Sequence, residues 1–218
     1  MSTFASAPIW SVITRFGEIQ ILAPAMMAMT AWLTMTGSRD FALRWFGFTA
    51  MAALLTTVTK VAFIGWGLGY APLDFTGISG HAMFAAAILP VIACCLAPSV
   101  PQRNVALMIG FAAALVVAVS RVAIGAHSVS ETVSAFALGA GASLLTLALA
   151  PPVPADAMRS SRILIAGIGL WLAAAPVGAP PDHTHGIVTR LSLTLSHHSQ
   201  PYTRREMWME YRRQQGRL

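Results

Sequence analysis

The chain has 218 residues, of which 56% are hydrophobic and only 10% are charged, and its formal net charge is +6. A soluble domain usually carries about 25% charged residues, so this composition excludes a soluble globular protein and predicts an all-α, polytopic membrane helical bundle. The positive charge does not indicate nucleic acid as a partner, because no nucleic-acid-binding motif accompanies it. Five arginines lie near the C-terminus, where anionic membrane lipids are the expected partner: Arg204, Arg205, Arg212, Arg213 and Arg217.

About 20 predominantly apolar residues are needed for a helix to cross a bilayer. Six stretches meet or approach this length, so about six transmembrane helices are predicted: 19–36, 41–69, 81–96, 105–125, 130–150 and 163–178. We divide the chain into a membrane-embedded bundle over residues 1–180 and a basic, polar C-terminal tail over residues 181–218. Within the tail, residues 206–215 are expected to form a surface helix.

Polar residues gather at four of the predicted helix ends. Successive helices cross the membrane in opposite directions, so the end of the second, the start of the third, the end of the fourth and the start of the fifth face the same side. Lys60, Arg121 and the segments 79–81 and 127–131 lie at these ends. Charges inside membrane segments are costly and favour a functional role. We therefore expect one polar site on this side.

The residue types at this predicted site suit phosphoryl transfer. Cations and backbone N–H groups at the start of a helix bind phosphate oxygens. One histidine can attack phosphorus, a carboxylate can orient it, and a second histidine can protonate the leaving oxygen.

The pattern S-R-x5-H-x3-E over residues 120–131, preceded by S-G-H over residues 79–81, resembles the type-2 phosphatidic acid phosphatase superfamily, which also includes the vanadium haloperoxidases. The motifs of that family are K-x6-R-P, P-S-G-H and S-R-x5-H-x3-D. In this chain Glu131 replaces the aspartate of the third motif, and Ile78 replaces the proline of the second. The first motif keeps Lys60, but Gly67-Leu68 occupies the Arg-Pro positions, and no arginine lies between Arg44 and Arg103 to replace the missing one.

The resemblance implies a role for each matching residue. His127 would be the nucleophile that forms a phosphohistidine, Glu131 would hold its imidazole, and His81 would be the general acid. The remaining residues would bind the phosphate: Lys60, Ser79, the Gly80 backbone N–H and Arg121. No metal ion or other cofactor is implied.

The implied function is a metal-independent phosphatase that acts on lipid phosphates or diphosphates at the membrane interface. The incomplete first motif leaves two alternatives open. One is a membrane binding or accessory protein that kept the anion site without catalysis, and the other is a lipid phosphotransferase.

Several of these residues also have purely structural interpretations. Ser128-x-x-Glu131 fits a helix capping box, His81 can be an interfacial histidine, and Lys60 and Arg121 can extend from helix ends to the interface. Asp74 is expected in a loop that can lie beside the site. The tail histidines are interpreted as solvated residues: His183, His185, His197 and His198.

Short connections opposite the predicted site carry five arginines: Arg39, Arg44, Arg103, Arg159 and Arg162. Because positive short loops are typically cytoplasmic, they favour a bacterial inner-membrane protein with an extracytoplasmic site. The C-terminal arginines fall on the site's own side and argue for the opposite orientation.

Overall fold

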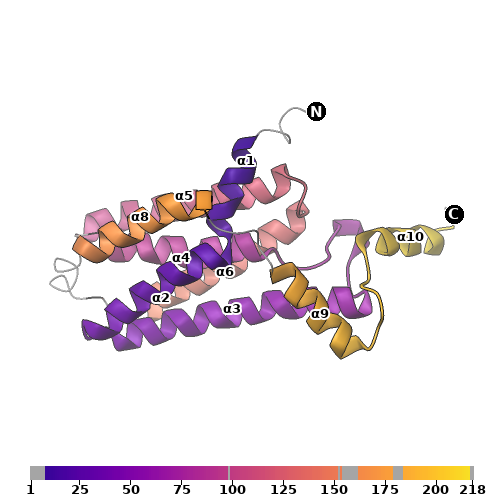
Figure 1. The fold of residues 1–218 in the computed structure, drawn as a ribbon, viewed down its shortest axis with the longest axis horizontal. Helices are drawn as coiled ribbons and strands as arrows, with labels where there is room; N and C mark the ends of the chain where they lie inside the picture. Colours follow the sequence, from indigo (N-terminus) through magenta and orange to yellow (C-terminus); the bar gives the residue numbers. More distant parts are fainter. Residues whose placement is uncertain (1–7, 98, 152, 154–161, 179–183, 217–218) are drawn as a thin grey trace.

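The computed structural model describes residues 8–97, 99–151, 153, 162–178 and 184–216. Over these residues it is all-α, as predicted, with one isolated bridge between Tyr70 and Phe75. The helices, drawn in Figure 1, are α1 (Pro8–Ile13), η1 (Thr14–Gly17), α2 (Ile19–Met35), α3 (Arg39–Trp66), η2 (Ala71–Leu73), α4 (Gly80–Leu96), α5 (Val100–Ala123), α6 (Val129–Leu149), α8 (Arg162–Gly178), α9 (Thr184–Ser196) and α10 (Arg204–Gln214).

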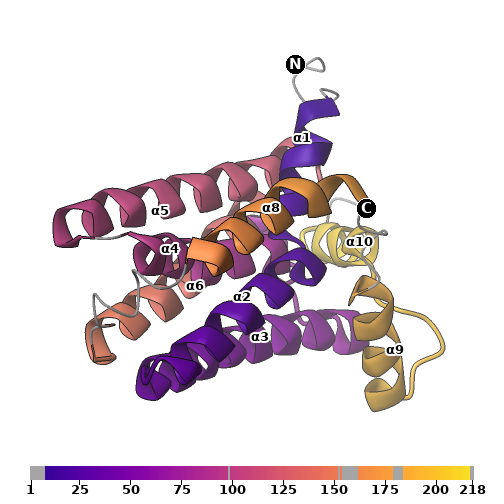
Figure 2. The ribbon, with the colours of Figure 1, turned by 60° about the vertical axis from the view of Figure 1, so that its left-hand side comes forward.

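Helix α4 is the centre of the bundle. It contacts α2, α3, α5 and α6, and Figure 2 shows it between α5 on one side and α2 and α3 on the other. Small residues allow this close packing. A Cβ atom at Gly139 of α6 would lie 2.2 Å from the Met83 carbonyl oxygen, and one at Gly110 of α5 would lie 2.5 Å from the Pro90 Cα. Both neighbouring helices can therefore approach α4 backbone to backbone.

Each of the six predicted membrane segments contains a helix, but the helices differ in length. Three of them, α3, α5 and α6, are long and apolar enough to cross a membrane, and the bent pair formed by Ile9–Gly17 and α2, with a 41° angle, can be a fourth. Helix α4 has 17 residues, or about 25 Å at 1.5 Å per residue, and so is shorter than a bilayer core of about 30 Å. By length and composition the described residues thus provide three or four spans, fewer than the six predicted.

The C-terminal segment, residues 184–216 with helices α9 and α10, packs onto the bundle at the end drawn on the right in Figure 1. Helix α9, which was not predicted, packs along α3. Helix α10 corresponds to the surface helix expected at 206–215, but begins two residues earlier and ends one residue earlier. The Tyr202 backbone N–H donates to the Ile64 carbonyl at 2.9 Å. Met207 is buried in a cluster with Phe63, Ile64 and Ala71. The C-terminal segment therefore covers the end of α3, beside the four helix ends at which the polar residues gather.

Candidate active site

A cavity of about 840 Å³ opens where α3 and α5 end and α4 and α6 begin. Of the seven site residues predicted from the sequence, five line it: Lys60, Gly80, His81, Arg121 and His127. The other two, Ser79 and Glu131, are fully buried behind this lining. The four helix ends thus converge as the crossing argument expects.

His127 and Glu131 form a hydrogen-bonded pair at the start of α6. The distance from His127 Nδ1 to Glu131 Oε2 is 2.8 Å. Glu131 also forms the capping box with Ser128: the Ser128 N–H donates to Oε2 at 3.1 Å, and the Glu131 N–H donates to the Ser128 hydroxyl at 3.3 Å. The carboxylate therefore caps the helix and holds the imidazole at the same time.

The second carboxylate oxygen of Glu131 faces the connection between α3 and α4. The Thr76 backbone N–H donates to Oε1 at 2.6 Å, and the Thr76 hydroxyl donates to it at 2.5 Å. Arg204 Nη2 lies 2.9 Å from Oε1 and 3.0 Å from Oε2. Because a buried carboxylate is costly unless it is paired and hydrogen-bonded, these donors explain how an acidic side chain with no exposed surface is accommodated.

The two predicted phosphate-binding cations approach the cavity from different helices. A Cβ atom built on Gly80 would lie 3.8 Å from Lys60 Nζ, so the ammonium group lies at the first turn of α4. Arg121 Nη1 donates to the Thr14 hydroxyl at 2.6 Å. Both cations line the cavity, where an anion would meet positive charge and the N-terminus of α4 together.

Ser79 is the N-cap residue of α4, and its backbone N–H donates to the Glu131 carbonyl at 3.4 Å. Its hydroxyl is buried and has no hydrogen-bond partner among the described residues. A buried hydroxyl without a partner is uncommon. It therefore retains the capacity to donate a hydrogen bond.

His127 lies in the connection between α5 and α6. Burial lowers its pKa below the ordinary value of 6.5; the hydrogen bond and charge of Glu131 oppose this shift, and the charges of Lys60 and Arg121 add to it. The imidazole is therefore mainly neutral at pH 7. A carboxylate can only accept, so the ring proton is on Nδ1, and Nε2 carries the lone pair with no hydrogen bond to any residue that the structure describes.

Three residues of this region were not predicted as site residues: Asp74, Thr76 and Arg204. Asp74, expected in a loop beside the site, pairs with Arg204 and accepts a hydrogen bond from Trp208 Nε1 at 2.9 Å. Arg204 was expected to meet lipid headgroups; instead its guanidinium bonds two carboxylates of the bundle. Thr203-x-x-Glu206 is a capping box that marks the start of α10, but no sequence pattern joins Arg204 to Glu131.

Two of the tail histidines lie near the site or the bundle. His185 lines the cavity, and His198 Nδ1 lies 2.8 Å from the Gly65 carbonyl oxygen, although both residues keep exposed surface. His197 is exposed, as expected, and His183 lies outside the described residues.

Residues 65–153 match the model of the PAP2 superfamily. The chain is also 37% identical over 148 residues to a protein of Klebsiella pneumoniae described as an uncharacterized 22.5 kDa protein in the cps region; the match covers 66% of this chain and 71% of that protein. No solved structure matches the chain significantly. On the family match and this relative, the chain belongs to the PAP2 superfamily, and this membership supports a phosphatase-type function.

Proposed function

We propose that this chain is a metal-independent phosphatase that hydrolyses lipid phosphates or diphosphates through a phosphohistidine at His127. One observation carries the proposal. Glu131 engages His127 at Nδ1, so the lone pair of Nε2 is available beside a cavity that Lys60 and Arg121 also line. A neutral, oriented imidazole next to fixed cations is the arrangement that nucleophilic attack on a phosphate requires.

In the first step, Nε2 of His127 attacks phosphorus and a P–N bond forms. The bond between phosphorus and the leaving oxygen breaks, and that oxygen takes a proton from His81. Lys60, Arg121 and the Gly80 backbone N–H bind the non-bridging oxygens, and the Ser79 hydroxyl donates one further hydrogen bond. Glu131 continues to accept the hydrogen bond from the Nδ1–H of His127, and its negative charge balances the positive charge that develops on the imidazole.

In the second step, water attacks the phosphohistidine. His81, which gave up its proton in the first step, now acts as the base and takes one proton from that water. The P–N bond breaks, inorganic phosphate leaves, and His127 returns to its neutral form. Both histidines then have their starting protonation states, so the cycle needs no metal ion or other co-reactant.

The apolar part of the cavity wall supports a lipid as substrate. Phe84 of α4 and Ile187, Val188 and Leu191 of α9 line the same cavity as the polar residues. A phosphate could lie among the cations while the chain attached to it lies against these side chains and the surrounding bilayer. Membrane lipids are accordingly the partners that we propose for this surface.

We also propose an inner-membrane location with the site on the extracytoplasmic side. Arg39 and Arg44 lie near the start of α3 and Arg103 lies near the start of α5, at the ends opposite the cavity, and positive charge near short loops favours the cytoplasm. Labelling of single cysteines introduced at each end, with a membrane-impermeant reagent on intact cells, tests this orientation. Labelling at the Arg39 end alone would show that this end is extracytoplasmic and would contradict the proposed orientation.

The function is tested by phosphate release from a panel of lipid mono- and diphosphates in detergent with EDTA present. We expect release by the wild type and by His197→Asn, a matched control at an exposed histidine with a positive φ of 57°, and no release by His127→Ala. Equal turnover by His127→Ala would exclude the proposed mechanism. Transfer of phosphate to an added lipid alcohol, without release to water, would identify a phosphotransferase. Vanadate binding without turnover on any substrate would identify an accessory protein.

A further inference from the structure

Glu131 needs a positive partner that none of the motif residues provides by a direct contact. Its carboxylate is fully buried, and its partners other than Arg204 are a neutral imidazole from His127, a hydroxyl and a backbone N–H from Thr76, and the Ser128 backbone N–H. A buried anion without a paired cation is strongly destabilising. The paired cation comes from Arg204, 73 residues further along the chain.

The guanidinium of Arg204 is held in one orientation by several acceptors. Nη2 donates to both oxygens of Glu131, at 2.9 and 3.0 Å, and to the Thr76 hydroxyl at 3.1 Å, while Nη1 donates to Asp74. The planar fork of arginine suits such an arrangement, whereas a lysine ammonium could not reproduce it. Arg204 therefore fixes Glu131 relative to the connection between α3 and α4.

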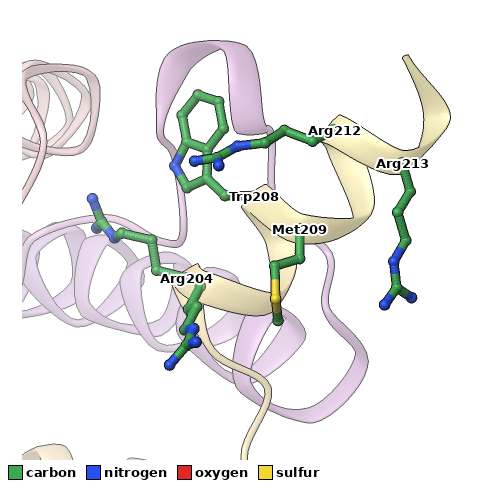
Figure 3. A pocket seen from close by; sticks show the side chains of 6 residues that line it. Arg204, Trp208, Met209, Arg212 and Arg213 are labelled. Carbon is green, nitrogen blue, oxygen red and sulfur yellow. The ribbon is translucent and has the colours of Figure 1, made fainter. Parts of the chain in front are cut away.

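The segment that carries Arg204 is anchored on both sides of it. Before it, the Tyr202 ring packs edge-on against Phe63 at a centroid distance of 5.5 Å. After it, Met207 is buried and Trp208 donates to Asp74; Figure 3 shows Arg204 and Trp208 at the start of α10, beside the α3–α4 connection. The arginine is thus presented by a docked part of the fold.

Gly67 provides the space for this docking. It ends α3 in the left-handed conformation, with φ +68°, and a Cβ atom there would lie 3.1 Å from the Tyr202 ring. Gly67 also stands where the first motif would have its arginine. A side chain at position 67 would therefore crowd Tyr202 and disturb the docking of the C-terminal segment.

We propose that Arg204 is a positioning residue of the active site, which the C-terminal segment delivers to hold Glu131 as the hydrogen-bond acceptor of His127. The inference rests on the proposed function of His127. Without Arg204, Glu131 would keep its hydrogen bond to His127. It would lose the two hydrogen bonds from the guanidinium that fix its orientation and the positive charge that neutralises its carboxylate. The uncompensated carboxylate would then stabilise a protonated His127, which cannot attack phosphorus.

The test compares wild type, Arg204→Ala, Arg204→Lys and Arg205→Ala by kcat and kcat/KM for phosphate release as functions of pH. Arg205 is the matched control, because it is exposed on the same helix and bonds no described residue. The other charged or titratable groups around His127 stay constant in all four proteins: Lys60, Asp74, His81, Arg121, Glu131 and His185.

Arg204→Ala should lower kcat about 10–100-fold, by analogy with the loss that follows when a residue holding a metal ligand in place is removed. It should also move the acid limb of the kcat/KM profile to higher pH, which a merely structural role would not do. Arg204→Lys should recover part of the rate, and Arg205→Ala should match the wild type. Wild-type kcat and an unmoved acid limb in Arg204→Ala would overturn the inference.

Two further measurements separate this inference from the proposed function. If His127→Ala were as active as wild type, the proposed function would fail; if it were inactive while Arg204→Ala stayed fully active, only the role of Arg204 would fail. Titration of His127 by NMR of histidine-labelled protein requires no turnover. An upward shift of its midpoint in Arg204→Ala, or in the neutral Arg204→Gln if the alanine variant does not fold, supports the inference, and an unchanged midpoint refutes it.

Discussion

Replacing Glu131 with glutamine tests, with almost no change in shape, whether the side chain must be a pure hydrogen-bond acceptor to hold His127 in the correct tautomer. The wild-type carboxylate can only accept hydrogen bonds, so it holds the proton of His127 on Nδ1. An amide nitrogen at the Oε2 position would donate to Nδ1 instead. The ring proton would then be on Nε2, and the lone pair would be directed away from the cavity.

The expected loss is large because the wrong tautomer has no nucleophile at Nε2. When the buried aspartate of a serine-protease triad is changed to asparagine, kcat falls about 10⁴-fold with the geometry intact. The same defect in Glu131→Gln corresponds to about 5.5 kcal/mol in the activation free energy. Oε1, which accepts from Thr76, would be retained, so the fold should survive, with a lower melting temperature because the amide nitrogen cannot accept from the Ser128 N–H.

The assay is phosphate release at saturating lipid substrate, with His127→Ala as the measure of background. Size-exclusion elution and thermal unfolding in the same detergent establish that the variant is folded. Glu131→Gln should fall close to this background. A folded Glu131→Gln protein with kcat within tenfold of the wild type would refute the tautomer argument.

Three further predictions follow from the geometry of the cavity. Because burial lowers the pKa of His127 below 6.5, the acid limb of kcat/KM should appear only as pH drops through that lowered pKa; an acid limb above pH 6.5 would contradict this. Ser79→Ala should leave thermal stability equal or higher, because it removes a buried hydroxyl without a partner, yet lower kcat/KM about tenfold through the lost bond to phosphate; unchanged kinetics would exclude Ser79 from phosphate binding. Gly67→Ala should destabilise by about 1–2 kcal/mol through its left-handed backbone and should reduce turnover by displacing Tyr202, whereas Gly141→Ala, with open space at its Cβ, should do neither when melting temperature and kcat are compared.

The helices of the bundle could be predicted from sequence because long apolar runs, closed by proline and glycine, report directly on membrane segments. Helix α9 could not. Its sequence over Thr184–Ser196 mixes threonine and serine with leucine and valine, and so has neither a long apolar run nor a strong cap. Its position depends on packing along α3, which no local pattern records.

The convergence of Lys60, His81, Arg121 and His127 could also be predicted, since it follows from counting membrane crossings and from motif spacing. The partner of Glu131 could not. Arg204 lies 73 residues beyond Glu131 and reaches the site from a segment that folds back across the end of α3. A contact of this kind is fixed by tertiary docking, and its only local sign is a helix cap at Thr203.

Two of the departures from the family motifs, Glu131 in the third and Gly67 in the first, are best understood as one structural arrangement. The two carboxylate oxygens of Glu131 accept hydrogen bonds from different parts of the fold. Oε2 accepts from His127 and Ser128 near the start of α6, and Oε1 accepts from Thr76 of the α3–α4 connection. An aspartate, one methylene shorter, could not extend as far toward Thr76 from the same turn. The longer side chain brings the carboxylate to the place where Arg204 can bridge both oxygens, and Gly67 leaves room for the segment that carries this arginine. A glutamate in the third motif, a glycine in the first and an arginine near the C-terminus therefore depend on one another, so restoring a single family residue should disturb the site.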